Sequence, residues 1–368
     1  MKVLLLADPS SAHTIKWANS LNEKGLEVFI FGLSKYEPDQ YNDNIQIESL
    51  KTPDKIKAKL DGNFLKIMYI AALPKLKRIV NSYKPDILHA HYVASYGVIG
   101  ALTGFRPFLV SVWGIDILTF PNNSFIHKAV VKFALKGADK VLATSEYLAT
   151  ETKKYTNQNI QVTPFGIDTE TFSSNSLNSC EKDEIIIGTV KSLERKYGIE
   201  YLIEAFSIVN KKYPEKNLKL ILVGGGSLEK KFRQMIHNLG IDDSAFITGQ
   251  IPYNQVVGYH NKFSIAVYVS TVESFGVSVL ESSACEKPVI VSSVGGLPEV
   301  VEDGITGIIV EPRNVNATAK AIEKLVLDSS LRKQYGKEGR EMVKRKYHWD
   351  NNLNGMIEIY NNILTKNL

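Results

Sequence analysis

Residues 3–14 read VLLLADPSSAHT: an apolar run, Val3 to Ala7, is followed at once by a loop of small residues and then by an amphipathic stretch of helical length. Similar short apolar runs recur through the first half of the chain, separated by further amphipathic stretches. They are Val28 to Phe31, Ile87 to His91, Phe108 to Trp113 and Val141 to Thr144. Such alternation predicts a parallel sheet covered by helices on both faces.

The same rhythm restarts in the second half of the chain. Its apolar runs are Ile185 to Val190, Leu218 to Val223, Phe246 to Thr248, Ile265 to Val269, Val289 to Val291 and Ile308 to Val310. A polar stretch at 173–182 interrupts the pattern, so we place a hinge between Thr163 and Asp183. The 368 residues therefore predict an α/β protein with two doubly wound sheets, 1–168 and 183–348, joined across a cleft.

The chain turns wholly helical after Pro312. In its last segment, residues 349–364, apolar side chains at Leu353, Ile357, Tyr360 and Leu364 follow spacings of 4, 3 and 4 and form one stripe. A stripe of this kind needs a surface to cover. We expect residues 349–368 to pack on the first domain.

Composition excludes several classes of protein. Hydrophobic residues make up 44% and charged residues 23%, which is ordinary globular usage, and the net charge of +5 is too small to indicate nucleic acid. Cys180 and Cys285 form no metal-ligand pattern. The N-terminal apolar run is too short for a signal peptide, and no apolar run approaches the roughly 20 residues that span a bilayer, so the expected location is cytoplasmic.

In a parallel sheet, ligands bind beyond the carboxyl ends of the strands. After the first strand, the backbone at Ser11 and Ala12 opens a helix and is suited to an anion, although a plain helix cap by Ser10 or Ser11 explains it equally. The loop lacks the G-x-G-x-x-G fingerprint, which disfavours an NAD enzyme.

Three polar residues lie at the ends of later strands of the first half or just after them. Alternation puts His89 and His91 on one face, where hydrogen bonding at the crevice is favoured over a metal site or a core histidine. Asp116, after Trp113 and Gly114, is either a helix cap or a substrate contact.

In the second half, Lys191, Arg195 and Lys196 follow a strand where the phosphates of a ligand would arrive, with a solvated charged loop as the alternative. Gly224 and Gly225 begin a glycine run that allows close approach of a ligand; a tight strand-to-helix turn explains the run nearly as well.

The most informative segment is residues 271–281, TVESFGVSVLE. A helix that starts near Ser274 or Phe275 would point its first N–H groups at a ligand, with Glu273 at the rim and Glu281 about two turns inside. Two carboxylates along one wall can hold the hydroxyls of a sugar and a ribose, and the helix start can hold phosphates. A glycoside hydrolase would instead place its carboxylates on opposite sides of one bond.

Along nearly its whole length, the chain resembles the retaining glycosyltransferases of family 4, which belong to group 1 and have the GT-B architecture of two Rossmann-like domains. The E-x7-E spacing of Glu273 and Glu281 carries the likeness best. Further matches are 287–290 (KPVI), 295–299 (GGLPE), 303–307 (DGITG), 165–168 (FGID) and 198–203 (GIEYLI).

The resemblance implies a role for each matching position. Glu281 would hold the ribose of a nucleotide-sugar donor and Glu273 the transferred sugar. Backbone at Ser274, Phe275, Gly276 and Val277 would meet the sugar and the diphosphate. An ungapped match puts Ser192 and Tyr197 on the family's cationic positions; we assign that role to Lys191 and Lys196, which keep the separation of five.

Two further departures stand out. Many members have Gly-Gly where this chain has Ser10-Ser11-Ala12, and the family's H-G-x-D pattern appears here as Trp113-Gly114-Ile115-Asp116. The family's histidine lies near the reacting sugar, so His91 or Asp116 would have to cover part of its role. No metal and no other cofactor is expected, because the helix dipole and the lysines stabilise the leaving diphosphate.

The sequence thus predicts a retaining hexosyl- or N-acetylhexosaminyltransferase. It would transfer the sugar of a nucleotide-sugar, with a UDP-sugar favoured, to a glycan or lipid-linked acceptor. A nucleotide-sugar epimerase on the same fold and a non-catalytic sugar-nucleotide binding module remain alternatives.

A membrane hypothesis concerns the predicted first domain. Nine cations against two acids between Lys51 and Lys84, and Lys128, Lys132, Lys136 and Lys140 at intervals of four, are typical of a surface that docks on anionic lipid. The alternative is a solvated face on a core helix.

Overall fold

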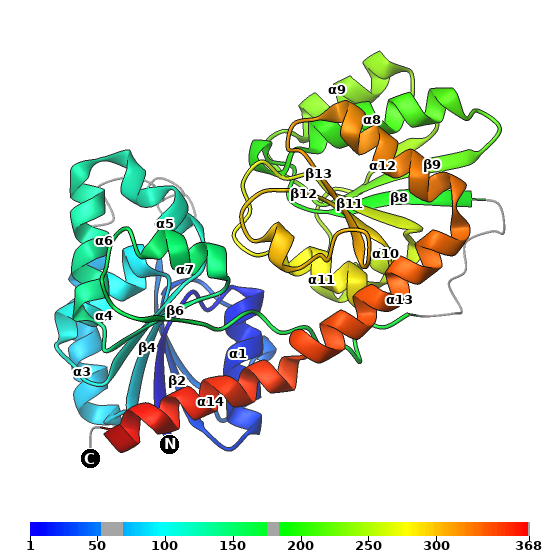
Figure 1. The fold of residues 1–368 in the computed structure, drawn as a ribbon. Coiled ribbons are helices and arrows are strands. Elements are labelled where there is room, and N and C mark those ends of the chain that lie inside the picture. The colour runs from blue at the N-terminus through cyan, green and yellow to red at the C-terminus, as the bar shows by residue number, and fades with distance from the viewer. Residues whose placement is uncertain (53–68, 175–183, 367–368) are drawn as a thin grey trace. The chain divides into compact units, whose positions relative to one another are not determined.

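The computed structural model describes residues 1–52, 69–174 and 184–366. It contains two parallel sheets. The chain divides into one unit of Met1–Pro164 with Asn352–Leu368 and a second of Phe165–Asn351 (Figure 1). The first unit therefore ends at Pro164, where the sequence indicated residue 168, and Asp183, the expected start of the second domain, lies outside the described residues.

The first unit contains a seven-stranded sheet in the order β3-β2-β1-β4-β5-β6-β7, with every pair parallel. Its strands are β1 (Lys2–Leu6), β2 (Glu27–Ser34), β3 (Gln46–Thr52), β4 (Ile87–His91), β5 (Phe108–Val112), β6 (Lys140–Ala143) and β7 (Ile160–Val162). Its helices are α1 (Ala12–Glu23), α3 (Leu73–Tyr83), α4 (Val98–Thr103), α5 (Ile115–Leu118), α6 (Phe125–Gly137), α7 (Glu146–Thr152) and most of α14 (Trp349–Lys366).

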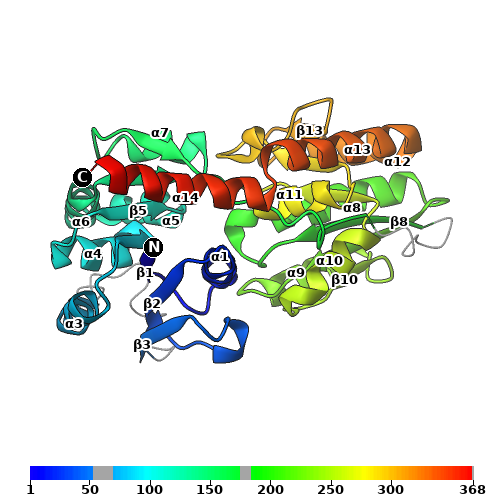
Figure 2. The ribbon, with the colours of Figure 1, turned by 90° about the horizontal axis from the view of Figure 1, so that it is seen from below.

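Alternation along the central strands supplies both faces of this sheet with apolar side chains. Leu88 and Ala90 of β4 join the core beneath α3, α4 and α6, while His89 between them points to the opposite face. There its ring Nδ1 lies 2.7 Å from the hydroxyl oxygen of Tyr360, and its Nε2 lies 2.8 Å from Ser111 Oγ. The sequence expectation that the last helix covers the first domain is confirmed (Figures 1 and 2).

The buried side of α14 differs in part from the predicted stripe. Leu353 and Tyr360 are buried as expected, but Met356 and Ile359 share that side, whereas Ile357 and Leu364 are only half-buried. Methionine and isoleucine at 356 and 359 complete a 3- and 4-residue spacing that the sequence prediction overlooked.

The second unit contains a six-stranded parallel sheet in the order β10-β9-β8-β11-β12-β13. Its strands are β8 (Glu184–Val190), β9 (Asn217–Val223), β10 (Ala245–Ile247), β11 (Ile265–Tyr268), β12 (Val289–Ser292) and β13 (Gly307–Val310). Its helices are α8 (Ile199–Lys212), α9 (Glu229–Leu239), α10 (Tyr253–Lys262), α11 (Val277–Ala284), α12 (Val315–Leu327) and α13 (Ser329–Lys346). Helices α8, α9 and α12 cover one face, and α10, α11 and α13 cover the other (Figure 1).

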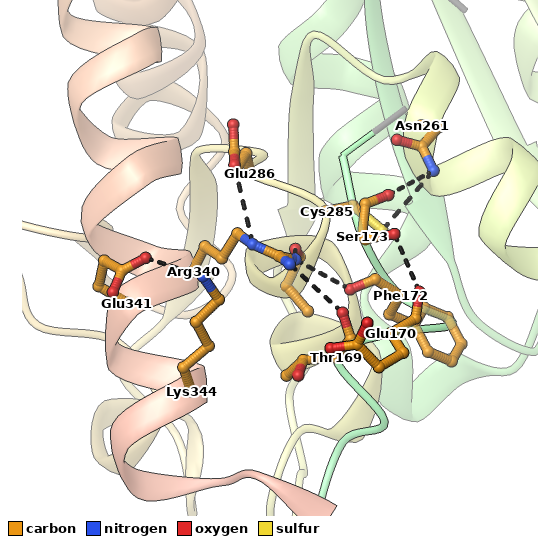
Figure 3. Close-up of polar contacts among 11 residues, drawn as sticks. Thr169, Glu170, Phe172, Ser173, Asn261, Cys285, Glu286, Arg340, Glu341 and Lys344 are labelled. Carbon is orange, nitrogen blue, oxygen red and sulfur yellow. Dashed lines mark hydrogen bonds and ion pairs between the residues drawn. The ribbon is translucent and has the colours of Figure 1, made fainter. Parts of the chain in front are cut away.

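The segment that enters the second unit is fixed by Arg340 of α13 (Figure 3). Its guanidinium donates to the carbonyl oxygens of Phe172 at 3.1 Å, Thr169 at 3.3 Å and Ala284, and its Nε lies 3.8 Å from a carboxylate oxygen of Glu286. Ala284 is the last residue of α11, where a cation also complements the helix dipole. Arg340 thus ties the entering segment and α11 together within this unit.

A prediction follows from the buried histidines of β4. Burial lowers the pKa of His89 from 6.5 to about 3, and burial together with His89 and His13 lowers the pKa of His91 as well. Below pH 6.5 the unfolded chain therefore binds protons that the folded chain does not, so the free energy of unfolding falls as the pH falls.

Between pH 6.5 and 5 we expect each histidine to contribute a slope of up to about 1.4 kcal/mol per pH unit, measured by urea unfolding. His89→Gln should remove one histidine's share of that slope. The exposed His237→Gln serves as the control. A slope that His89→Gln leaves unchanged would show that this histidine is protonated inside the fold.

Candidate active site

The strand order of the second sheet changes direction at β8, because β9 lies on one side of it and β11 on the other. Loops that leave such neighbouring strands diverge and open a crevice at their carboxyl ends. Lys191 directly follows β8, and Glu273 follows β11. The topology therefore brings together two residues that lie 82 positions apart.

Lys191 and Glu273 form a nearly buried ion pair. Nζ donates to Oε2 at 2.6 Å, and the two side chains are 10% and 11% exposed. Burial pushes the pKa of Lys191 down, but the adjacent Glu273 carboxylate and Tyr197 outweigh this and leave it above the ordinary value. The lysine is therefore a fixed positive charge.

Lys196 lies close to the same group of side chains. Its Nζ is 4.8 Å from the ring centre of Tyr197, and the Nζ of Lys191 is 4.9 Å from that centre. The backbone carbonyl of Lys196 accepts from Thr271 and Val272, which fixes the loop after β8 against the loop after β11. Two lysines beside one aromatic ring make a cationic wall at this edge of the sheet.

The glycine run after β9 holds that loop in place. Gly224 has a φ of +136°, and a Cβ there would lie 2.3 Å from the carbonyl oxygen of Lys191. Glu194 accepts from the backbone N–H of Ser227 at 2.7 Å and from its hydroxyl at 2.6 Å. Gly225 similarly lies against the backbone of Gln250. The structure gives the run a packing role, and predicted ligand contacts at Gly224 and Gly225 stay predictions.

Helix α11 starts at Val277, two to three residues later than predicted. Gly276 causes the delay, because it caps the helix with a φ of +114° that a residue with a side chain rarely adopts. Among the described residues, no acceptor binds the backbone N–H groups of 275–278. Four donors at a helix start suit an anion such as a diphosphate.

Glu281 lies about one turn inside α11, not two, and its carboxylate lies next to two side chains of α10. The Tyr253 hydroxyl donates to Oε1 at 3.0 Å, and His260 Nε2 lies 3.4 Å from Oε2. His260 Nδ1 lies 2.8 Å from the hydroxyl oxygen of Ser282. Sequence reasoning missed Tyr253 and His260, because nothing in the spacing of α10 indicates a partner on α11.

The first unit has its own crevice where its strand order changes direction, between β1 and β4. A cavity of about 550 Å³ opens there. Its aromatic lining consists of Tyr69, His91, Tyr92, Tyr96, Trp113 and Phe120. Among the described lining residues, Asp8 carries the one formal charge.

His91 and Trp113 form one wall of this cavity. Their ring centres are 4.6 Å apart, and the ring of His13 meets Trp113 at 5.9 Å. His91 Nδ1 is buried without a hydrogen-bond partner among the described residues. His89 lies behind His91 at 4.7 Å and belongs to the core. The prediction that both rings share one face is confirmed.

Asp116 is fully buried behind the wall. Its carboxylate accepts from the backbone N–H groups of Gly114 at 2.8 Å, Val93 at 2.9 Å and Trp113 at 3.3 Å. Burial raises its pKa, although these three donors favour the ionised form. Of the two sequence readings, the geometry favours backbone capping, and Asp116 positions Trp113.

Ser11 and Ala12 begin α1, with Ser11 at the N-cap and in the cavity lining. The alternative of a cap by a serine side chain is wrong: Ser11 makes no such bond, and Ser10 donates both its N–H and its hydroxyl to Asp8. A carboxylate two residues earlier accepts these donors more strongly than a hydroxyl would. An anion role for Ser11 and Ala12 stays a prediction.

Within residues 1–52, 69–174 and 184–366, no group of three His, Cys, Asp or Glu side chains is arranged to hold a metal ion.

Comparison with known proteins identifies the family. The model for glycosyl transferases group 1 matches residues 172–342, and a glycosyl transferase 4-like model matches residues 2–145. The capsular polysaccharide biosynthesis glycosyltransferase CapM of Staphylococcus aureus is 30% identical over 353 residues, which cover 89% of this chain and 87% of CapM. The chain belongs to the group 1 glycosyltransferases.

Solved structures agree with this group 1 glycosyltransferase in fold. Sucrose-phosphate synthase from Thermosynechococcus elongatus matches over the whole of both chains with a TM-score of 0.85 and 22% identity. Anabaena HepE, solved in complex with UDP, has a TM-score of 0.81 and 18% identity over 98% of this chain and all of HepE. The expected GT-B fold is confirmed.

The buried ion pair of this glycosyltransferase generates a stability prediction. Lys191→Met or Glu273→Gln alone leaves one partner without its counter-ion, so each should lower the free energy of unfolding by about 3 to 5 kcal/mol. The double variant should lose clearly less than the sum. Urea unfolding of the four proteins measures the coupling.

The exposed pair Lys344 and Glu341, with 3.2 Å between Nζ and Oε1, is the matched control and should couple by less than about 1 kcal/mol. Additive losses at Lys191 and Glu273 would contradict the ion pair.

Proposed function

We propose that this transferase moves a hexose or N-acetylhexosamine from a nucleotide-sugar, with a UDP-sugar favoured, to a glycan or lipid-linked acceptor in polysaccharide or glycolipid biosynthesis, with retention at the anomeric carbon. The observation that carries the proposal is the meeting of Lys191, Glu273 and the start of α11 where the second sheet changes direction. The relation to CapM supports the biosynthetic role, and the HepE complexes with UDP and UDP-glucose support the donor class.

The donor's diphosphate fits the backbone N–H groups of 275–278 and the ammonium groups of Lys191 and Lys196. Lys191 already holds one negative group, Glu273, so an arriving phosphate offers it a second partner. Glu281 is suited to accept further hydroxyl donors, because the Tyr253 hydroxyl orients its carboxylate. We assign the ribose to Glu281 and the transferred sugar to Glu273.

Transfer breaks the bond between the anomeric carbon and the diphosphate oxygen, and its electron pair leaves with the diphosphate. The acceptor hydroxyl oxygen forms the new bond on the same face, and its proton passes to a donor phosphate oxygen. Glu273 is paired with Lys191, which suits an electrostatic role better than attack on the sugar. Lys191, Lys196 and the N–H groups stabilise the charge that develops on the leaving group.

The cavity of the first unit is suited to the acceptor. Aromatic rings such as those of Trp113 and Tyr96 are suited to pack against the apolar faces of sugar rings. The Asp8 carboxylate can accept hydrogen bonds from sugar hydroxyls, and the Ser11 hydroxyl can donate or accept them. Burial keeps His91 neutral, so its ring lines the cavity without adding charge.

Two rival functions make different products. An epimerase on this fold would convert its nucleotide-sugar with no acceptor present. A binding module would be stabilised by the nucleotide and would release none. Measuring nucleotide release from UDP-, GDP- and ADP-sugars with and without a sugar acceptor separates the three, and a transferase requires the acceptor.

Glu281→Ala should weaken binding of the free nucleoside diphosphate by about 1.5 to 3 kcal/mol, because it removes charge-assisted bonds to the ribose. Glu273→Ala should spare that affinity and lower turnover. Calorimetry with UDP measures the first effect and a transfer assay the second. Equal losses of nucleotide affinity in both variants would contradict this division of roles.

Loss of Lys191 or Lys196 should lower kcat more than it raises KM, since both act on charge that develops on the departing diphosphate. Lys196→Ala should be the more severe, because Lys196 lies in the turn just before Gly198, the residue that caps α8. A chelator should leave wild-type activity intact. Unchanged kcat in Lys196→Ala would show that another cation serves the leaving group.

A further inference from the structure

Helix α6 of the first unit exposes three large apolar side chains. Phe125 is 81% exposed, Phe133 46% and Ile126 40%. The opposite side of the helix is buried, because Val131 and Leu135 belong to the core beneath it. The exposed apolar face is therefore additional to the face that the fold requires.

Lysines run beside that apolar face. Lys128, Lys132 and Lys136 are spaced by four and are exposed. At 100° per residue they fall in one strip that also carries Phe125, and Phe133 and Ile126 lie in the strip next to it. Among the described residues, no carboxylate forms an ion pair with these three lysines.

We propose that this face of α6, Phe125, Ile126 and Phe133 with Lys128, Lys132 and Lys136, docks on a membrane surface that contains anionic lipid. The lysines complement the headgroup phosphates, and the aromatic rings enter the boundary between headgroups and acyl chains. Each lysine strengthens binding about fivefold, so three together give about 100-fold. The helix lies on the surface; no helix in the described parts of the chain is long and apolar enough to cross a bilayer.

The structure narrows the membrane hypothesis drawn from the sequence. Lys140 belongs to β6 and not to α6, so three of the four spaced lysines share the helix. Tyr69 and Leu73, which lie among the cations of 51–84 in the sequence, pack in or against the first core. Of those cations, Lys51, Lys75, Lys77, Arg78 and Lys84 lie on or next to β3 and α3 and not on α6. The stretch with Lys55, Lys57, Lys59, Phe64, Leu65, Lys66, Ile67 and Met68 lies outside the described residues.

Sedimentation with vesicles tests the proposal in the absence of any sugar donor, so its result does not depend on transferase activity. Wild-type protein should bind vesicles of phosphatidylglycerol and phosphatidylcholine at low salt, bind pure phosphatidylcholine at least tenfold more weakly, and lose most binding at 0.5 M salt, a concentration at which the Debye length is only about 4 Å.

Two sets of variants separate charge from insertion. Changing Lys128, Lys132 and Lys136 to Glu should weaken binding at least 100-fold. The same change at Lys230, Lys231 and Lys333 alters the net charge equally on the second unit and should leave binding within about threefold. Phe125→Ser with Phe133→Ser should weaken binding about tenfold, whereas the control Phe246→Ser, at a ring that is 48% exposed, should not.

Several outcomes would overturn the proposal: no binding of the wild type at low salt, equal effects of the two lysine sets, or unchanged binding of the double serine variant. Equal unfolding midpoints show that the variants fold. A dimer in solution that the double serine variant abolishes, together with absent vesicle binding, would assign the face to a second copy of the chain.

Discussion

Parallel strands place all their carboxyl ends at one edge of a sheet, and both crevices of this molecule depend on that constraint. In each unit the strand order changes direction once, next to the first strand of that unit. This strand is β1 in the first unit and β8 in the second. The strand ends and loops there carry Asp8 and His91 in one unit and Lys191 and Glu273 in the other. Residues far apart in sequence thus become neighbours.

Charges at the second site are buried and paired before any ligand arrives. Lys191 is matched by Glu273, and Glu281 accepts a hydrogen bond from Tyr253. An unpaired charge in these places would be costly, so the pairs set the geometry that a donor meets. Under the proposed function, we expect a donor phosphate to approach Lys191 as a second anionic group, so that the ion pair changes on binding.

The sequence carries most of the fold, because buried parallel strands are short continuous apolar runs. All eleven predicted runs are strands, and the helical end of the chain is also confirmed. Strand β3 was missed because Gln46–Thr52 mixes polar and apolar residues at a sheet edge, and β7 because it has only three residues. The late start of α11 depends on the left-handed backbone of Gly276, which a motif cannot show.

The individual residues of the site could be predicted from the sequence, but the contacts between them could not. Glu273, Glu281 and Lys191 stand out by position after strands, yet nothing in the spacing indicates that Lys191 pairs with Glu273 or that α10 holds Glu281. Asp116 and the glycine run show the converse. The charge of Asp116 suggests ligand binding, but its carboxylate binds backbone N–H groups. The glycine run suggests close approach of a ligand, but it packs against neighbouring backbone. Contacts between distant segments are properties of the folded chain.

The most direct test of the central claim is a crystal structure of the protein with UDP bound. We predict diphosphate oxygens within hydrogen-bond distance of the backbone N–H groups of 275–278 and of Lys191 Nζ, with the ribose hydroxyls on Glu281. A diphosphate seated instead on Ser11 and Ala12 of the first unit, with Lys191 still bound only to Glu273, would contradict the account.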